Sequence, residues 1–310
     1  MRGVRSTEEG IQVVQTSPGD QGGVRVSVVS SGICASDLHL ASFGPVPVTL
    51  GHEFSGRLDD GTPVAVLPAV SCGECDRCRA GHDQQCAAVL GAMYGVSLDG
   101  GLADVAWVDP TCAKVVPPSL PLEQACLVEP LAVALHGVDR AGVQPGMRVL
   151  VIGGGPIGLC TVAATRNCGA DVDLVARHQR RIEAGERLGA RVSTGSEYDI
   201  VLDAAGSQSS LDTALQRVRP GGTIGVIGTF WDPVALGPGF QLKEVTMTPA
   251  FTYGHHRGVP EFVAAMGILE SIPDLAETIV THHFSLDEAA EAFRVAGDRA
   301  SGAIKVIVHP

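Results

Sequence analysis

Residues 148–158 read RVLVIGGGPIG, in which an apolar run leads directly into a glycine-rich turn and the start of a helical pattern. The run is typical of a strand buried on both faces. Three of the glycines fit G-x-G-x-x-G, which lets the backbone approach a pyrophosphate at a helix N-terminus. A merely tight strand-to-helix turn is the alternative in a chain with 39 glycines. The flanking strand and helix favour a dinucleotide site. The residues predicted to contact the cofactor here are Gly153, Gly155, Pro156, Ile157 and Gly158.

Downstream of this segment, apolar runs alternate with helical patterns. The runs read DVDLVA at 171–176, IVLDA at 200–204 and TIGVIG at 223–228, and amphipathic stretches separate them. This alternation predicts a doubly wound parallel sheet.

The first part of the chain has a different texture. VRVSV at 24–28 alternates as a half-buried strand does, and short strands with Gly and Pro turns continue to the segment that precedes Glu129. The sequence therefore predicts an α/β protein in which a Rossmann domain, residues 131–261, interrupts a mainly β domain, residues 1–130 and 262–310.

The end of the second strand of a Rossmann domain usually selects the cofactor. An acid there binds the ribose 2′-hydroxyl of NAD, whereas an arginine suits the 2′-phosphate of NADP. Asp173 lies 20 residues after Gly153, but we place it inside the strand. Arg177 and Arg181 follow the strand, so the sequence favours NADP over NAD. The alternative is that these arginines are a solvated start of a helix.

Composition disfavours several classes of partner. The 310-residue chain carries a formal net charge of −12, which disfavours nucleic acid and anionic membrane surfaces. No apolar run reaches the roughly 18–20 residues of a membrane span, and the N-terminus MRGVRSTEEG lacks a signal-peptide core. We therefore expect a cytoplasmic protein that acts on a small molecule.

Four of the nine cysteines are clustered as C-x2-C-x2-C-x7-C. They are Cys72, Cys75, Cys78 and Cys86. In a reducing compartment such a cluster favours a metal site over disulfides. Four thiolates close a tetrahedral zinc and leave no open position, so this zinc would be structural. An iron–sulfur cluster is the alternative that spacing leaves open.

A second set of metal-ligating residue types is dispersed along the chain and comprises Cys34, His52, Glu53 and Glu129. A catalytic zinc takes three protein ligands and keeps a position for water or substrate. A thiolate, an imidazole and a carboxylate would serve. A lone Cys or His is more often a core residue, so spacing alone leaves this site open.

Motifs spread along the chain resemble those of the medium-chain, zinc-dependent alcohol dehydrogenases, particularly the sorbitol and threonine dehydrogenase branch. The motifs are GICASDLH (32–39), TLGHEFSG (49–56), CGECDRCRAGHDQQC (72–86), LVEPLAVALHG (127–137), VLVIGGGPIG (149–158), RPGGTIGVIG (219–228) and THHFSLDEAAEAF (281–293). Their joint occurrence in this order is highly specific. The resemblance implies a discontinuous GroES-like domain with a Rossmann domain, an active site between the two, and a homodimer or homotetramer.

The resemblance also implies roles for particular residues. Cys34, His52 and Glu129 match the ligand positions of the catalytic zinc, and Glu53 matches a carboxylate beside the metal. Asp37 matches a partner that orients the ligating histidine. The remaining implied positions are Ser36 and His39 in the proton relay and Gly228 in the cofactor site. From the residues alone, Asp37 could instead be a helix N-cap, and His39 a surface side chain.

The implied activity is hydride transfer between a secondary alcohol, such as a polyol or sugar alcohol, and a nicotinamide cofactor. An amino-alcohol dehydrogenase of the threonine type is the second reading. A catalytically inactive nucleotide-binding sensor or scaffold is disfavoured by the intact Cys34, His52, Glu129 and Ser36. The connection between Cys34 and His52 and the segment GRLDDGTPVAV are short for the family, so the size of the substrate remains open.

Overall fold

A computed structural model describes residues 1–17, 22–256 and 258–310. The chain divides into two compact units. The first unit consists of residues 1–129, 262–270 and 280–310, and the second unit consists of residues 130–261 and 271–279. The expected division differs from these units at 271–279. Helix α9 (Pro273–Ile279) groups with the second unit because it contacts α4 (Pro156–Asn167) and α5 (Gln179–Arg187), with Leu275 and Ile279 buried.

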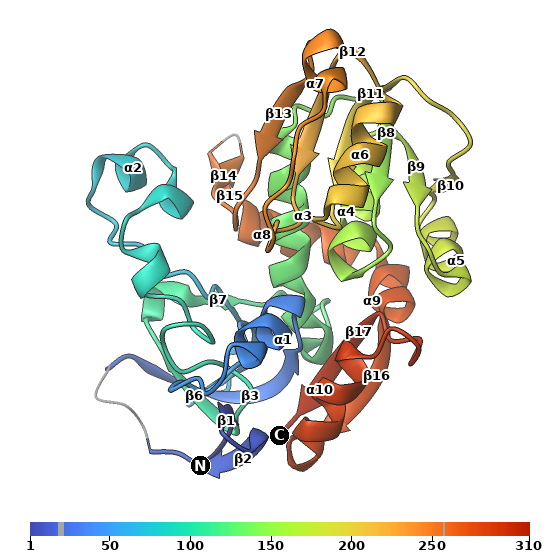
Figure 1. Ribbon diagram of the computed structural model, residues 1–310. Coiled ribbons are helices and arrows are strands. Elements are labelled where there is room, and N and C mark those ends of the chain that lie inside the picture. The colour runs from blue at the N-terminus through green and yellow to red at the C-terminus, as the bar shows by residue number, and fades with distance from the viewer. Residues whose placement is uncertain (18–21, 257) are drawn as a thin grey trace. The chain divides into compact units, whose positions relative to one another are not determined.

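The second unit contains a six-stranded sheet in the order β10-β9-β8-β11-β12-β13, with every neighbouring pair parallel (Figure 1). Its strands are β8 (Arg148–Ile152), β9 (Asp171–Val175), β10 (Arg191–Val192), β11 (Tyr198–Asp203), β12 (Val218–Val226) and β13 (Thr246–Pro249). This is the strand order of a doubly wound sheet. From β8 the chain adds strands toward one edge of the sheet (β9, β10) and then returns to add strands on the other side (β11, β12, β13), so the order reverses between β8 and β11. The predicted parallel sheet is confirmed.

Helices cover both faces of this sheet. Leu211 and Ala214 of α6 (Gln208–Arg217) pack in one cluster with Ile224 of β12. Neighbouring strand residues point to opposite faces, and Gly225 lies against Ala141, directly after α3 (Val128–Arg140). The remaining elements are α7 (Pro238–Leu242), β14 (His255–His256) and β15 (Val259–Pro260).

The first unit is built on a seven-stranded sheet in which β16-β17-β3-β4-β5-β7 follow one another and β6 pairs with β3. Its strands are β3 (Val24–Gly32), β4 (Glu53–Leu58), β5 (Pro63–Val66), β6 (Val105–Val108), β7 (Ala113–Val115), β16 (Val280–Ser285) and β17 (Lys305–His309). The tail therefore joins the N-terminal β region, as the sequence predicted. The pairs are antiparallel except for β16 with β17.

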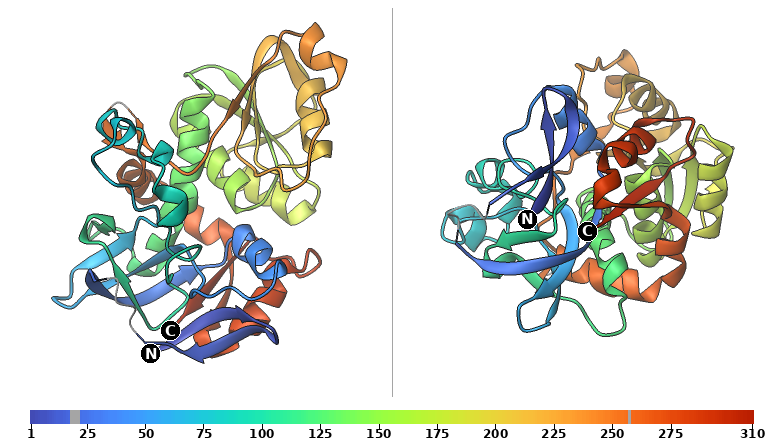
Figure 2. Two further views of the ribbon diagram at one scale, coloured as in Figure 1. Left: turned by 60° about the vertical axis from the view of Figure 1, so that its left-hand side comes forward. Right: turned by 90° about the horizontal axis from the view of Figure 1, so that it is seen from below.

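Short elements complete the first unit. They are the hairpin β1 (Arg2–Thr7) and β2 (Gly10–Gln15), helices α1 (Ala35–Ser42), α2 (Asp76–Arg79), α8 (Glu261–Ser271) and α10 (Ala289–Gly297), and 3-10 turns at Asp83–Gln85, Val89–Gly91, Pro110–Cys112, Leu122–Leu127 and Leu286–Glu288. The two chain ends lie near each other in this unit (Figure 2). No helix of the described residues is long and apolar enough to span a membrane.

Candidate active site

The ends of two paired strands bring three of the predicted metal ligands together. Gly32 at the end of β3 pairs with Glu53 at the start of β4. Cys34 follows as the N-cap of α1, and His52 precedes β4 directly. One ligand atom each of Cys34, His52 and Glu53 lies within 4.8 Å of the others. A thiolate, an imidazole and a carboxylate are the side-chain types that bind zinc, so the chemistry of this donor set fits that ion.

Asp37 ties the two ligand-bearing segments together. Its fully buried carboxylate accepts the N–H of Cys34 at 2.9 Å and that of Gly51 at 3.3 Å. It also lies 3.4 Å from Nδ1 of His52. Burial lowers the pKa of His52, but the charges of Asp37 and Cys34 outweigh it and raise that pKa well above its ordinary value. Asp37 is not the N-cap of α1, because Cys34 is at that position. Asp37 is the third residue of the helix, and its side chain accepts the backbone N–H of Cys34 in a capping box.

The two residues implied for a proton relay lie on α1. Ser36 Oγ is 3.4 Å from Nε2 of His52. His39 is in the last turn, one helical turn from Ser36, and stacks on Phe43 with ring centroids 6.5 Å apart.

Lys305 is a member of this site that sequence reasoning missed. Its Nζ donates to both carboxylate oxygens of Glu53, at 2.8 and 2.6 Å, and to the carbonyl of Ile33 at 3.1 Å. Lys305 is 1% exposed and Glu53 is fully buried. A Cβ on Gly32 would collide with the Glu53 carboxylate, so the glycine leaves the room that the ion pair occupies. A lysine inside an apolar strand is the only signal that could have indicated it.

Glu129 is buried in the first turn of α3 but is not among the three ligands that lie within 4.8 Å of one another. Burial raises its pKa to about 7, with Glu53 adding to the rise and His52 and Lys305 opposing it. The carboxyl group of Glu129 therefore interacts electrostatically with His52, Glu53 and Lys305.

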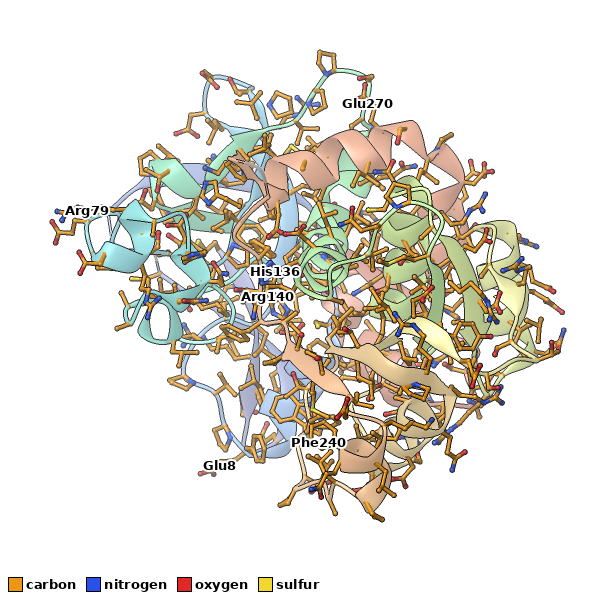
Figure 3. All side chains as sticks on the ribbon, turned by 90° about the horizontal axis from the view of Figure 1, so that it is seen from above. Glu8, Arg79, His136, Arg140, Phe240 and Glu270 are labelled. Carbon is orange, nitrogen blue, oxygen red and sulfur yellow. The ribbon has the colours of Figure 1, made fainter. Side chains whose placement is uncertain are left out.

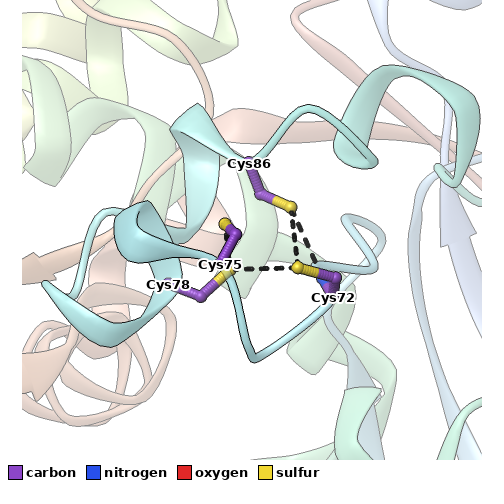
Figure 4. Close-up of side chains that lie close together, drawn as sticks. All are labelled: Cys72, Cys75, Cys78 and Cys86. Carbon is purple, nitrogen blue, oxygen red and sulfur yellow. Dashed lines mark hydrogen bonds between the residues drawn. The ribbon is translucent and has the colours of Figure 1, made fainter.

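The four clustered cysteines converge as the sequence predicted (Figure 4). Their sulfurs are 3.5 Å apart between Cys75 and Cys78, 3.6 Å between Cys72 and Cys86, and 3.9 Å between Cys72 and Cys78. All are free thiols, and these separations exclude disulfides, whose sulfurs are about 2.05 Å apart. Zinc–sulfur bonds of about 2.3 Å give tetrahedral edges of about 3.8 Å, so the cluster fits zinc.

The protonation of these thiols is unequal in the absence of an ion. The N–H groups of Cys72 and Ala88 lower the pKa of Cys86 to about 6. Burial and the neighbouring sulfur of Cys75 raise the pKa of Cys78 to about 12. Binding of a metal by all four would therefore displace protons.

The glycine-rich turn connects β8 to α4 as the motif requires. Gly153 has a φ of +114°, and Gly155 is the N-cap of α4, with Pro156 at its first position. A Cβ on Gly158 would collide with the carbonyl of Gly153, so only glycine permits this approach of helix and turn. Ile157 follows in the first turn of the helix, where its carbonyl accepts the Thr161 hydroxyl.

The end of β9 carries arginine side chains. Asp173 lies inside the strand, where its carboxylate accepts the Tyr198 hydroxyl at 2.6 Å and Nε–H of Arg191 at 2.9 Å. Arg177 is exposed at the tip and donates to Ser209 at 2.8 Å. Arg181 passes the glycine-rich turn closely, because a Cβ on Gly154 would lie 2.7 Å from its Cβ.

Asp203, a second residue missed by sequence reasoning, joins two turns at the carboxyl edge of the sheet. Its carboxylate accepts the N–H groups of Ala205 and Gly206 at 2.9 and 3.1 Å. Its carbonyl accepts those of Ile227 and Gly228, both at 2.9 Å. Burial raises the pKa of Asp203. The predicted cofactor residue Gly228 therefore lies at the same edge as the glycine-rich turn.

Comparison with known families gives two matches. Residues 20–118 match the alcohol dehydrogenase GroES-like domain, and residues 156–269 match the zinc-binding dehydrogenases. The L-arabinitol 4-dehydrogenase of Aureobasidium melanogenum is 32% identical to this chain, covering 99% of it and 92% of that protein.

Solved structures share the whole fold. A protein from Sinorhizobium meliloti 1021, described as a zinc-binding dehydrogenase and bound to NADP, has a TM-score of 0.87 and 28% identity over 100% of this chain and 99% of that chain. An alcohol dehydrogenase from Escherichia coli CFT073, complexed with NADH, has a TM-score of 0.88 and 26% identity over 100% and 99%.

Proposed function

Because the chain belongs to the zinc-dependent medium-chain alcohol dehydrogenase family, we propose that it interconverts a polyol or sugar alcohol and the corresponding ketone. The chain is an oxidoreductase of secondary alcohols that uses zinc and a nicotinamide cofactor. The convergence of Cys34, His52 and Glu53 carries the proposal, because their thiol, imidazole and carboxylate groups lie within 4.8 Å of one another and form a donor set of the kind that holds zinc. The activity of the relative on L-arabinitol supports the class of substrate.

The roles of the residues follow from their chemistry. Cys34 and His52 would hold the catalytic zinc, with Glu129 nearby as a ligand that acts directly or through water and Glu53 as a carboxylate beside the ion. When bound, zinc supplies the positive charge that acidifies an alcohol, and the nicotinamide supplies the hydride acceptor. Asp37 holds the orientation of His52. Ser36 would accept the substrate proton at its Oγ and pass it toward His39.

The second metal site is structural in this proposal. Cys72, Cys75, Cys78 and Cys86 would hold a zinc with no open position. Four free thiols in a short lobe support a reducing, cytoplasmic location. We further propose a homodimer or homotetramer. We also propose a functional division into a catalytic domain, residues 1–130 and 262–310, and a cofactor domain, residues 131–261, with residues 271–279 packed on the cofactor domain.

We propose that NADP is preferred to NAD. The carboxylate of Asp173 already accepts hydrogen bonds from Tyr198 and Arg191, so it is not available to bind a ribose 2′-hydroxyl. Arg177 and Arg181 supply positive charge for a 2′-phosphate. The glycine-rich turn between them and the sheet, Gly153 to Gly158 with Pro156 and Ile157, would receive the pyrophosphate.

The metal content of the purified chain tests the proposal. We expect about two zinc ions per chain, one lost in Cys34→Ser and the other in Cys75→Ser. Oxidation of a panel of polyols with NADP and with NAD should be abolished in Cys34→Ser. A single zinc that is indifferent to Cys34, or no turnover by the zinc-loaded wild type with any polyol, would contradict it.

A further inference from the structure

Two histidine side chains meet at the edge of the seven-stranded sheet of the first unit. His283 belongs to the edge strand β16, and His309 belongs to the neighbouring strand β17. Nδ1 of His283 is 2.9 Å from Nε2 of His309, the ring planes are 16° apart and the ring centroids are 5.2 Å apart. One ring nitrogen of each histidine therefore faces the other across a single hydrogen bond.

The backbone fixes which nitrogen of His309 carries hydrogen. Nδ1 of His309 lies 3.0 Å from the carbonyl oxygen of Val29, and a carbonyl can only accept, so this nitrogen is the donor. Val29 is the extra residue of a β-bulge, because the register of β3 with β4 shifts between Val28 and Ser30. A neutral His309 therefore presents the lone pair of its Nε2 to His283, whose Nδ1–H donates to it.

The partner of each ring distinguishes this pair from a buried histidine elsewhere in the chain. His136, on α3, lies 2.8 Å from the carboxylate of Glu261 (Figure 3). A carboxylate supplies the negative charge that complements a histidine, so His136 already has an electrostatic partner. His283 and His309 each face another imidazole instead. An imidazole supplies no such charge, and the neutral ring is the form that binds metal ions.

The environment of His309 is typical of a metal ligand. A ligating histidine usually donates its other ring N–H to a backbone carbonyl or a carboxylate, which holds the ring in place. Two nitrogens bound to one ion at about 2.0–2.1 Å are about 2.9–3.4 Å apart for angles between about 90° and 109°. The separation of Nδ1 of His283 from Nε2 of His309 lies at the lower end of this range. Because His283 is exposed, its ring can turn until both lone pairs point at the ion.

The two nitrogen ligands select the class of cation. Imidazoles suit nickel, copper and zinc, whereas magnesium and calcium take oxygen ligands. The ion replaces the hydrogen that lies between the rings, and this hydrogen moves to Nε2 of His283. Both imidazoles therefore stay neutral, and binding releases no proton.

We propose that His283 and His309 bind a divalent transition ion, such as nickel or copper, which fastens the edge strand β16 to β17. Both ligands and Val29 belong to the first unit. His309 is four residues beyond Lys305 on β17, about 13 Å along the strand, and this pair shares no ligand with the proposed zinc sites. The inference is independent of the proposed alcohol substrate.

Nickel binding to the zinc-loaded protein without an affinity tag tests the site. Equilibrium dialysis against nickel sulfate, followed by metal analysis, should find about one more nickel per chain in wild type than in His283→Ala, whose affinity should be at least about tenfold lower. His282→Ala is the matched control, because the adjacent side chain points to the opposite face of β16 and its Nδ1 lies 3.0 Å from the Thr281 hydroxyl. The control should bind nickel as wild type does.

The spectrum of bound copper identifies the ligands. With one equivalent of Cu²⁺ on the zinc-loaded protein, the electron paramagnetic resonance of wild type should show hyperfine coupling to two nitrogens. His283→Ala and His309→Ala should each lose this pattern. Because His283 is exposed, its replacement leaves the packing of the sheet unchanged, and the result with this variant decides the question if His309→Ala fails to fold.

Amide hydrogen exchange tests whether the ion fastens the strand. Nickel should slow exchange at 280–285 at least about tenfold in wild type and His282→Ala, and should have no effect in His283→Ala. Equal nickel binding by wild type and His283→Ala overturns the site, as does an equal loss of binding in His282→Ala. Nickel binding that leaves exchange at 280–285 unchanged overturns the fastening of β16.

Discussion

Replacing Lys305 with methionine would leave the Glu53 carboxylate buried without its cationic partner. The lysine makes three hydrogen bonds, two to Glu53 at 2.6 and 2.8 Å and one to the Ile33 carbonyl at 3.1 Å. Hydrogen bonds to charged groups contribute about 1.5–3 kcal/mol each. Removing one partner of a buried pair costs about 3–5 kcal/mol. We therefore expect metal-free Lys305→Met to lose about 3–5 kcal/mol of stability in the unit that contains the pair.

Chemical denaturation of the chelator-treated protein measures this loss. The double variant Lys305→Met/Glu53→Gln removes both charges and should recover most of it. With zinc bound, the single variant should lose less, because the cation can neutralise Glu53. A loss below about 1 kcal/mol in metal-free Lys305→Met, or a double variant no more stable than the single one, would refute the reasoning.

Three further predictions concern the orientation of a ligand, the cofactor and pH. Asp37→Asn weakens the carboxylate that holds two ligand-bearing segments, so zinc affinity by competition titration should fall about 10–100-fold; unchanged affinity would exclude the orienting role. Arg181→Ala should raise the KM of NADP about tenfold more than that of NAD. Arg180→Ala, a change at the exposed neighbouring residue, should alter the KM of NADP and that of NAD by the same factor or alter neither. Hydrogen bonds from Arg2 hold the pKa of Asp104 below its unfolded value, so its stabilisation is complete above pH of about 3.9 and is lost as pH falls through the folded pKa. Asp104→Asn should therefore be about 1–2 kcal/mol less stable at pH 7 and converge with wild type in acid; a gap that persists in acid would be inconsistent with this linkage.

Local features of the chain were predictable because short-range chemistry governs them. The strand RVLVI and the turn after it depend on apolar content and on glycines within a few residues, and β8 and α4 form as predicted. Cys72 to Cys86 span one short lobe, so their convergence needs no long-range contact. The position of Asp173 inside its strand likewise follows from the run of residues around it.

Other features required strand pairing and packing. The engagement of Asp173 by Tyr198 and Arg191 could not be derived from spacing, because β9, β10 and β11 must first assemble. The grouping of α9 with the second unit depends on which helices its apolar face meets, and an amphipathic pattern does not identify its partner.

The sequence by itself determined the fold class, the two metal-binding sets as candidates and the cofactor motif, since each depends on residue type and local period. Only the tertiary structure decided that Lys305 neutralises Glu53 across the space left by Gly32, and that His283 faces His309. These contacts join segments far apart in the chain. Their energy comes from burial of charge and from paired strands, and neither exists until the chain has folded.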